Sequence, residues 1–416
     1  MDPMQSRLFR YAKIAVSGAW IMAVLAILAD REVYQSTLVS GFFCLALLAA
    51  TVIHLRVYPR LREALWVTLL AAVFAILDFG LLRFRFIPVA LVSFLGCASL
   101  LLMGVKAVWS APGRRRLVFS AFIAALLFVS SDWMASTFLD WTEVLHPKTL
   151  DLYLLYFDGS LGFQPSFALA ELFQRWRWLW WVSISFYIGL PMSIAIVYAN
   201  QLLRRAAYAA PMIFAFVITG PLGVLFYNIF PATGPIHILR ADFPFHPLSF
   251  FDLSHLLLEP ISVHAPRNAI PSLHMAWVLL VWWWSRGLSW WIKGISLAFL
   301  VFTIFATLGT GEHYLVDLVV ALPFAVMIQG TSTLLWRSSL RDQVTPIVAG
   351  ALGTFGWLAL LRFAPRFCWM SQALPWLLIL LTVIVFLPIE RRYCRYPEGA
   401  VLNEDADLRL ISATAD

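Results

Sequence analysis

The sequence is poor in charged residues and in cysteine. Charged residues make up 13% of the 416 positions, whereas hydrophobic residues make up 61%. A soluble domain is roughly one-quarter charged and one-half apolar, so this composition excludes an ordinary soluble protein and indicates an integral membrane protein. The four cysteines are widely separated and form no Cys-x-x-Cys pair. This spacing favours packing residues over a disulfide framework or a metal site.

Several other features are also missing. There is no internal repeat, no low-complexity tract and no coiled-coil heptad. The first apolar stretch, near residues 14–29, lacks a small-residue cleavage site and is interpreted as a retained helix instead of a signal peptide. The net charge of +7 does not indicate nucleic acid as a partner, because basic residues of membrane proteins gather in cytoplasmic loops.

Long apolar runs, by contrast, are abundant. A hydrocarbon core about 30 Å thick is crossed by roughly 20 apolar residues in a helix. On that measure the sequence predicts an all-α integral membrane protein with about twelve transmembrane helices. We expect them near residues 13–30, 35–55, 64–82, 87–109, 117–139, 178–200, 207–230, 271–285, 291–310, 314–336, 344–362 and 371–389.

The distribution of basic residues predicts the orientation. With the N-terminus in the cytoplasm, about two-thirds of the 30 Lys and Arg residues fall on the cytoplasmic side, which is the usual bias. Both termini are then cytoplasmic, and two long loops, near residues 140–177 and 231–270, lie on the extracytoplasmic face. The first loop is rich in apolar and aromatic residues, so we expect interfacial helices over residues 147–176.

Two histidines stand at span edges on this outer face, His274 in "PSLHMAW" and His313 in "GTGEHYLVDLVV". Asp317 follows His313 by four residues, a spacing that places both side chains on one face of a helix. A charged residue costs about 2.5–3.5 kcal/mol at the centre of a bilayer, so it is a functional candidate by default. With its tautomer fixed by Asp317, His313 could act as a nucleophile, while His274 could donate a proton to a departing oxygen.

The residues around His274 form a candidate anion site. Asn268 and Ser272 supply polar side chains, and the N-terminus of the following helix offers unpaired backbone N–H groups. Arg267 adds a positive charge suited to phosphate, and Arg240 is a weaker candidate. This set requires neither a metal nor a cofactor.

Each of these features also has a simpler explanation. A histidine at a helix end is often an interfacial cap, and a His-x-x-x-Asp pair can join two helices without catalysing anything. Two histidines and an aspartate could also form a facial metal triad, although further ligands usually stand nearby.

The "PSLH" motif, followed 39 residues after its histidine by "HYLVD", resembles the type-2 phosphatidic acid phosphatase superfamily. More narrowly, it resembles the branch of inositol phosphorylceramide synthases and related bacterial membrane proteins. The segments "YNIFPATGP" and "LDLYLLYFDGSLGFQPS" are similar to segments of that branch. The resemblance covers residues 117–336 and implies that His313 forms a phosphohistidine, Asp317 orients it and His274 protonates the leaving group.

Two positions depart from the phosphatase branch. Leu273 stands where that branch has glycine, and Thr307 stands where it has arginine. Its lysine and Arg-Pro motif is also absent. The synthase-like branch lacks these features too, so the departures affect only the question of which basic residues hold the phosphate.

The sequence thus predicts four parts. These are an N-terminal four-helix membrane region (1–116), a catalytic core (117–336), two C-terminal transmembrane helices (337–389) and a cytoplasmic tail (390–416). The predicted function is that of a lipid phosphatase or phosphotransferase, which transfers from a lipid phosphate or phospholipid to water or to a polyol or sugar hydroxyl. The alternatives are a polytopic transporter and a non-catalytic lipid-binding membrane protein. Transporters often show two related halves, and we find none here.

Overall fold

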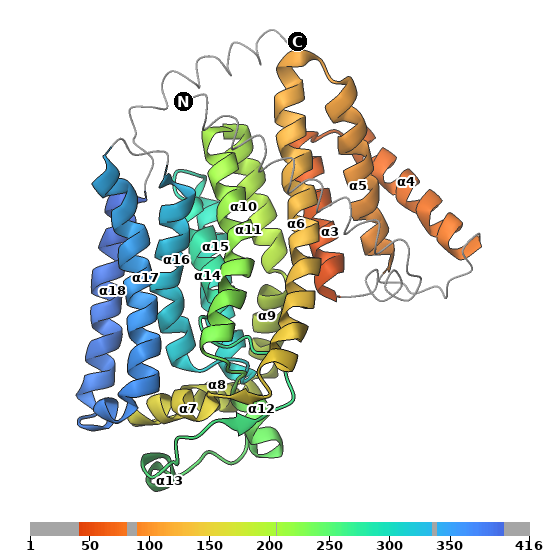
Figure 1. The fold of residues 1–416 in the computed structure, drawn as a ribbon. Helices are drawn as coiled ribbons and strands as arrows, with labels where there is room; N and C mark the ends of the chain where they lie inside the picture. The colour runs from red at the N-terminus through yellow and green to blue at the C-terminus, as the bar shows by residue number, and fades with distance from the viewer. Residues whose placement is uncertain (1–40, 81–89, 205, 335–338, 395–416) are drawn as a thin grey trace.

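The computed structural model describes residues 41–80, 90–204, 206–334 and 339–394 (Figure 1). Long helices dominate these residues. They are α3 (Gly41–Val57), α4 (Leu61–Gly80), α5 (Ala90–Trp109), α6 (Pro112–Leu145), α9 (Arg177–Ile188), α10 (Leu190–Arg204), α11 (Ala206–Ile229), α14 (Leu273–Trp284), α15 (Trp290–Gly309), α16 (Leu315–Ser332), α17 (Leu340–Phe363) and α18 (Ala373–Tyr393).

The predicted all-α membrane architecture is confirmed. Among the described residues, seven helices are long and apolar enough to cross a membrane, and an eighth span is obtained if the bent pair α9 and α10 is counted as one. A helix occurs at every predicted span from 35–55 onward, while the first predicted span, 13–30, lies outside the described residues. The estimate of about twelve crossings relied partly on short helices. Because α14 has 12 residues, it extends only about 18 Å, less than the hydrocarbon thickness.

The predicted span 178–200 is a bent pair instead of one straight helix. The axes of α9 and α10 differ by 52°. The break falls at Gly189, where an added Cβ would lie 2.7 Å from the carbonyl oxygen of Ser185. Pro191 follows two residues later and has no N–H to continue the helical hydrogen bonds.

The helix α16 occupies the interior of the bundle. Its apolar stretch is 78% buried, compared with 17% for α4 and 22% for α18. Figure 1 shows α17 and α18 on one side of α16 and the group α3, α4 and α5 at the far side, beyond α6. The outer helices therefore present the lipid-facing surface, and α16 is surrounded by protein.

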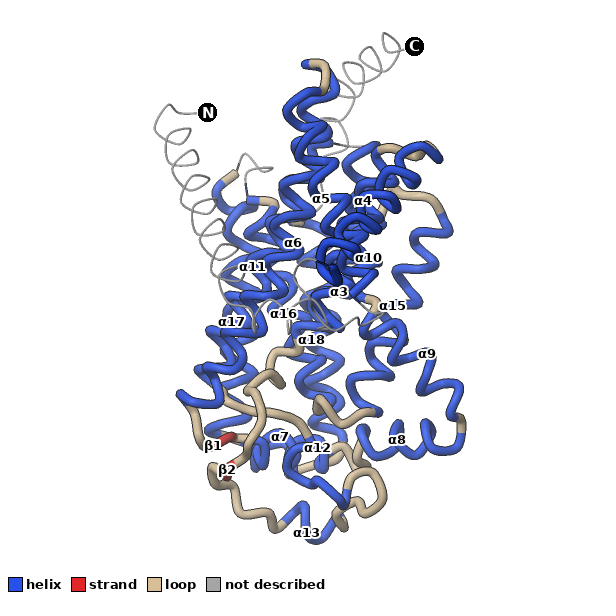
Figure 2. Tube along the Cα trace, turned by 90° about the vertical axis from the view of Figure 1, so that its right-hand side faces the viewer, coloured by secondary structure: helices blue, strands red, loops and turns tan. Residues whose placement is uncertain are grey.

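Short elements cover one end of the bundle. The helices α7 (Asp151–Ser160) and α8 (Pro165–Arg175) lie across this end, and α12 (Pro235–Leu239) and α13 (Phe250–Ser254) lie beyond them (Figures 1 and 2). The antiparallel strands β1 (Lys148–Thr149) and β2 (Ile261–Ser262) join the two long loops. Two 3-10 turns, η1 (Arg240–Asp242) and η3 (Pro365–Trp369), complete the layer. The expected interfacial segment does contain two helices, but nearly every residue of α7 is buried.

Candidate active site

The imidazole of His313 and the carboxylate of Asp317 lie together in the interior. The distance from His313 Nδ1 to Asp317 Oδ2 is 3.4 Å, and both side chains are buried. The predicted pairing is therefore present, but its cause differs from the one expected. His313 precedes the helix, Tyr314 is the N-cap, and Asp317 Oδ2 also accepts the backbone N–H of Tyr314 at 2.8 Å. The turn that leads into α16, not a shared helical face, brings the two side chains together.

The other ring nitrogen of His313 meets the "PSLH" motif. His313 Nε2 lies 3.2 Å from Ser272 Oγ. Ser272 is the N-cap of α14, and its backbone N–H donates to the carbonyl oxygen of Asp317 at 3.2 Å. With the Nδ1 proton directed at the carboxylate, Nε2 carries the lone pair and accepts the serine hydroxyl. In that tautomer the unprotonated nitrogen is directed at Ser272.

His274 is held by a tyrosine of α9. The hydroxyl of Tyr187 lies 3.2 Å from His274 Nδ1, and the two rings stack with their centroids 4.1 Å apart. In the protonated ring both nitrogens carry a proton, so Nδ1 can donate to the Tyr187 oxygen while Nε2 has a proton to give up. Sequence spacing gave no signal for Tyr187, because it comes from a span remote from both motifs.

Backbone contacts fix the position of His313. Its N–H donates to the carbonyl oxygen of Thr307 at 3.1 Å, and its own carbonyl accepts the hydroxyl of Ser166 on α8 at 2.9 Å. Thr307, which replaces the arginine of the phosphatase branch, thus has a structural role through its main chain. The interfacial segment contributes Ser166, which the sequence analysis did not single out.

Two glycines allow the segment "PATGP" to approach this loop. An added Cβ on Gly234 would lie 2.5 Å from the carbonyl oxygen of Glu312, so only glycine fits there without displacing the backbone. Gly311 has a φ of +75°, a left-handed conformation that favours glycine, and its carbonyl accepts the N–H of Ile236 at 3.0 Å. The residues before His313 are thereby clamped to the loop that follows α11.

A carboxylate of α7 caps the N-terminus of α16. Asp158 is buried and accepts the backbone N–H groups of Leu315 at 2.8 Å and Val316 at 3.3 Å, which begin α16. Negative charge at a helix N-terminus is favourable. Burial nevertheless raises the pKa of Asp158 to about 8, and the nearby charge of Asp317 acts in the same direction.

A second carboxylate of α7 lies on the same face, seven residues earlier. Asp151 accepts the backbone N–H of Thr233 at 3.1 Å and the hydroxyl of Tyr314 at 3.0 Å. Burial raises the pKa of Asp151 as well. The sequence analysis missed both carboxylates because it treated this segment as apolar. Their spacing of seven residues, which places them on one helical face, was the available signal.

The guanidinium of Arg267 is fully buried and its donors are occupied. Nε and Nη2 donate to the carbonyl oxygen of His146 at 2.8 and 2.5 Å, and Nη2 also donates to that of Val263 at 2.9 Å. Nη1 donates to the carbonyl oxygen of Ala265, and the backbone N–H of Arg267 donates to Thr142 Oγ1 at 2.9 Å. Arg267 therefore ties the second long loop to the end of α6. Its predicted role in binding phosphate stays a prediction.

The remaining predicted phosphate ligands differ in their settings. Asn268 Oδ1 is buried without a hydrogen-bond partner in the described structure, while Arg240 is exposed at the C-terminal end of α12. A cation that the sequence analysis missed lies nearer to the histidine loop. His237 Nε2 is 3.6 Å from the carboxylate of Glu312, the residue before His313. The interaction between the two side chains raises the pKa of His237 and lowers that of Glu312.

Leu273, the residue that replaces the glycine of the phosphatase motif, packs against a glycine of another helix. A Cβ added to Gly223 on α11 would lie 2.3 Å from Leu273 Cδ2. The larger side chain in the motif is thus accommodated by the missing side chain on α11. Within the described residues, no group of three or more His, Cys, Asp or Glu side chains is arranged to ligate a metal.

Residues 152–331 match the sequence model of the PAP2 superfamily. The matched range includes His274, His313 and Asp317 and the carboxylate Asp158 on α7. The match supports, at a coarse level, a membrane enzyme of the phosphatase type that acts on a lipid phosphate. No curated protein and no solved structure matches the chain.

Proposed function

We propose that this protein transfers a phosphoryl group or a phosphorylated headgroup from a membrane lipid through a phosphohistidine at His313. The observation that carries the proposal is the environment of its two ring nitrogens. Nδ1 faces the carboxylate of Asp317 at 3.4 Å, and Nε2 faces only the small hydroxyl of Ser272 at 3.2 Å. A histidine so arranged has one oriented nitrogen and one available for bond formation.

In the proposed first step, Nε2 of His313 forms a bond to phosphorus as the bond to the leaving oxygen breaks. The protonated ring of His274 donates its Nε2 proton to that oxygen and becomes neutral, so the leaving group departs as a neutral hydroxyl. Asp317 is a positioning residue that stabilises the positive charge developing on the His313 ring. In the second step, a hydroxyl or water attacks the phosphohistidine and gives its proton back to His274, which restores both histidines.

Ser272 and Asn268 are the polar side chains that we assign to the phosphate. Ser272 Oγ is already within hydrogen-bond distance of His313 Nε2. The oxygen of the Asn268 amide is buried without a partner, and the nitrogen of the same amide can donate to a phosphate. Arg267 would support this site by holding the backbone that carries Asn268. Direct phosphate binding by Arg267 and Arg240 remains the other possibility, and His237 adds a third cationic side chain close to the loop.

The finer assignment is a transferase that resembles inositol phosphorylceramide synthases, with a polyol or sugar hydroxyl as acceptor. The sequence motifs of that branch and the absence of the phosphatase-type arginine at Thr307 support it. The same covalent intermediate would serve hydrolysis, because only the attacking group changes. We further assign the site to the extracytoplasmic face, with both termini cytoplasmic and residues 117–336 as the catalytic core.

The experiment uses purified protein in detergent with radiolabelled phosphatidic acid, phospholipids and polyprenyl phosphates and diphosphates, with and without hydroxyl acceptors such as inositol. We expect His313→Ala to abolish turnover and labelling of the protein. With a radiolabelled substrate whose leaving group needs no proton, such as a p-nitrophenyl ester, we expect His274→Gln to slow breakdown of an alkali-stable, acid-labile phosphoenzyme, which should therefore accumulate. The products identify the acceptor. Transfer of a phosphoryl group to water releases free phosphate, and transfer to inositol gives a phosphomonoester. Transfer of a phosphorylated headgroup to water releases that headgroup phosphate, and transfer to inositol gives a phosphodiester.

His264→Ala is the matched control. His264 lies in the same outer loop, its side chain is 90% exposed, and its contact is with Glu143 instead of the site. Its turnover should equal that of the wild type. Turnover that survives His313→Ala would falsify the phosphohistidine mechanism, and turnover without any labelled intermediate in the His274 variant would overturn the two-step scheme.

A further inference from the structure

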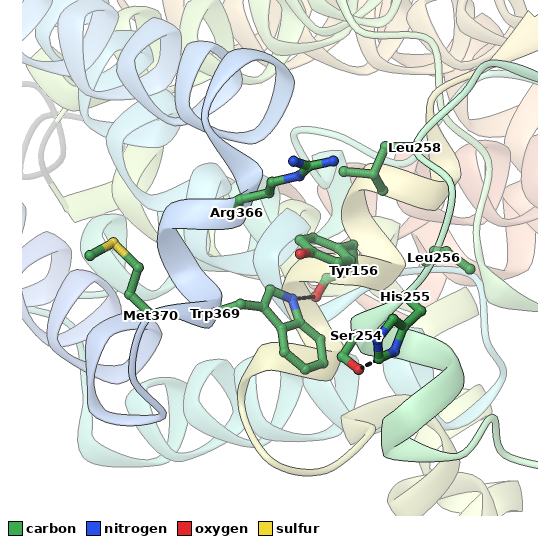
Figure 3. Close-up of a pocket in the computed structure, with 8 residues that line it drawn as sticks. All are labelled: Tyr156, Ser254, His255, Leu256, Leu258, Arg366, Trp369 and Met370. Atoms are coloured by element: carbon green, nitrogen blue, oxygen red, sulfur yellow. Dashed lines mark hydrogen bonds between the residues drawn. The ribbon is translucent and has the colours of Figure 1, made fainter.

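A cavity of about 440 Å³ opens at the end of the bundle, on the side of α7 that faces the turn between α17 and α18 (Figure 3). Its walls come from α7, from α13 with the loop that follows it, and from η3. Figure 3 shows polar, aromatic and apolar side chains around it. They are Tyr156, Ser254, His255, Leu256, Leu258, Arg366, Trp369 and Met370.

The cavity is separate from the candidate active site. Tyr156 lines the cavity, whereas Asp151 and Asp158 of the same helix reach Tyr314 and the start of α16. Positions 151 and 158 lie on one face of a helix, and position 156 lies on the opposite face. The helix α7 therefore forms a wall between the two, and a ligand in the cavity would not contact His313.

Two basic side chains line the cavity. Arg366 is exposed, and no carboxylate in the described part of the chain forms an ion pair with it. His255 lies across from it, with Nδ1 within 2.9 Å of the carbonyl oxygen of Phe251 and 3.0 Å of Ser254 Oγ. Because Nδ1 donates to that carbonyl, Nε2 is the ring nitrogen left to meet a ligand, and it donates to an anion when the ring is protonated. The cavity thus offers a guanidinium fork and an imidazole to an anion.

Aromatic rings packed at a tilt hold the base of the cavity in place. The rings of Tyr156 and Trp369 have centroids 5.1 Å apart, and Trp369 Nε1 donates to the carbonyl oxygen of Tyr156 at 2.9 Å. The ring of Phe250 also packs against Trp369, with ring centroids 5.0 Å apart. Burial raises the pKa of the Tyr156 hydroxyl, and the nearby charge of Arg366 opposes this shift. The hydroxyl therefore stays protonated and can donate to the same anion as Arg366.

The surroundings of the cavity indicate a lipid instead of a free anion. Exposed apolar side chains flank Arg366 along the turn between α17 and α18, with Phe363 84% exposed and Met370 76% exposed. Below this turn the apolar stretch of α18 is only 22% buried and faces the bilayer. A basic, hydrogen-bonding cavity next to a lipid-facing apolar surface matches both parts of a phospholipid.

We propose that this cavity binds the phosphate-bearing headgroup of an anionic phospholipid, with Arg366, His255 and the Tyr156 hydroxyl on the phosphate and the acyl chains along the turn between α17 and α18. The assignment is independent of the reaction at His313. It gives the C-terminal helix pair a role, because η3 supplies Arg366 and Trp369 to the site.

The test measures binding of short-chain phosphatidylglycerol to the purified full-length protein, with phosphatidylcholine and inorganic phosphate as the comparison probes. All variants carry His313→Ala, so that no probe is consumed. Arg366→Gln should raise the Kd for phosphatidylglycerol by roughly 10-fold to 100-fold, the usual effect of losing hydrogen bonds to a charged group. Arg391→Gln is the matched control, since Arg391 is an exposed arginine at the opposite end of α18.

A second measurement locates the ligand. Phosphatidylglycerol with brominated acyl chains should quench tryptophan emission, and Trp369→Phe should remove part of that quenching. If Arg366→Gln does not fold, His255→Gln takes its place. Equal affinity of Arg366→Gln and Arg391→Gln would overturn the proposal, as would equally tight binding of phosphatidylcholine. Displacement by inorganic phosphate at equal concentration would show a free-anion site and overturn the assignment to a lipid.

Discussion

The carboxylate of Asp158 accepts the backbone N–H of Leu315 at 2.8 Å and so joins α7 to the first residue of the helix that carries Asp317. His313 lies two residues before this contact, and Tyr314, between them, is bound to Asp151 of the same helix. A helix that lies across the end of the bundle thus sets the position of the loop that carries His313. The predictions below test this support and the residues that depend on it.

Stability should depend on pH through Asp158. Its pKa is about 8 in the folded protein and near 4 when unfolded, so the folded state holds a proton that the unfolded state has lost between these values. The contribution of Asp158 to the free energy of unfolding is fully present below pH 4. It is lost as the pH rises from 4 to 8, by at most about 1.4 kcal/mol per pH unit. Asp158→Asn should flatten this slope in thermal unfolding measured from pH 5 to 8.5. An unchanged slope would show that Asp158 is ionised throughout.

Tyr187→Phe should lower turnover by roughly 10-fold to 100-fold while leaving the fold intact, because it removes only the hydroxyl that orients the ring of His274. The stacked ring is retained. A substrate with a good leaving group, such as a p-nitrophenyl ester, needs no proton from His274 and should be affected much less in the first step. An equal loss on both substrates would contradict the assignment of Tyr187 as a positioning residue for His274.

Gly223→Ala should destabilise the protein by about 1–3 kcal/mol, since the new Cβ would lie 2.3 Å from Leu273 Cδ2. The double variant Gly223→Ala with Leu273→Gly should recover part of this loss, and a double-mutant cycle of thermal unfolding measures the coupling. Gly220→Ala, on the same helix with nothing within 4 Å, is the control and should change stability little. Additive effects of the two substitutions would mean that the side chain of Leu273 can move away.

Arg267→Lys should lower the free energy of unfolding by roughly 2 kcal/mol or more, because an ammonium group cannot reach the three carbonyls that the guanidinium bridges. The measurement compares unfolding with substrate affinity. A structural arginine lowers stability and leaves KM of the folded fraction nearly unchanged. A raised KM at wild-type stability would instead establish Arg267 as a phosphate ligand.

Much of the bundle was predictable because a bilayer imposes one requirement, namely long apolar helices with internally paired backbones. The pairing of His313 with Asp317 was predicted from their spacing of four residues, although the turn into α16 and not a shared helical face produces it. The residues that hold His274 and the loop of His313 in place were not predictable. Tyr187, Ser166 and Asp158 come from three different helices, and only the packing of those helices brings them to the two motifs.

Arg267 illustrates the limit of chemical analogy. An arginine beside "PSLH" suggests phosphate binding by its charge, yet its neighbours in space are carbonyl oxygens of a loop and of a helix end. Sequence shows that a donor is present. It does not show which acceptors the fold brings within reach, and His237 was missed for the same reason.

Because α16 is enclosed by other helices while α4 and α18 face lipid, substitutions in this chain should not be tolerated evenly. A change of side-chain volume on α16 must be matched on a neighbour, as at Gly350, where an added Cβ would lie 2.6 Å from the carbonyl oxygen of Pro323. The lipid-facing residues of the outer helices need only remain apolar. We therefore expect related proteins to diverge from the periphery inward, with the interior helix as the last element to change.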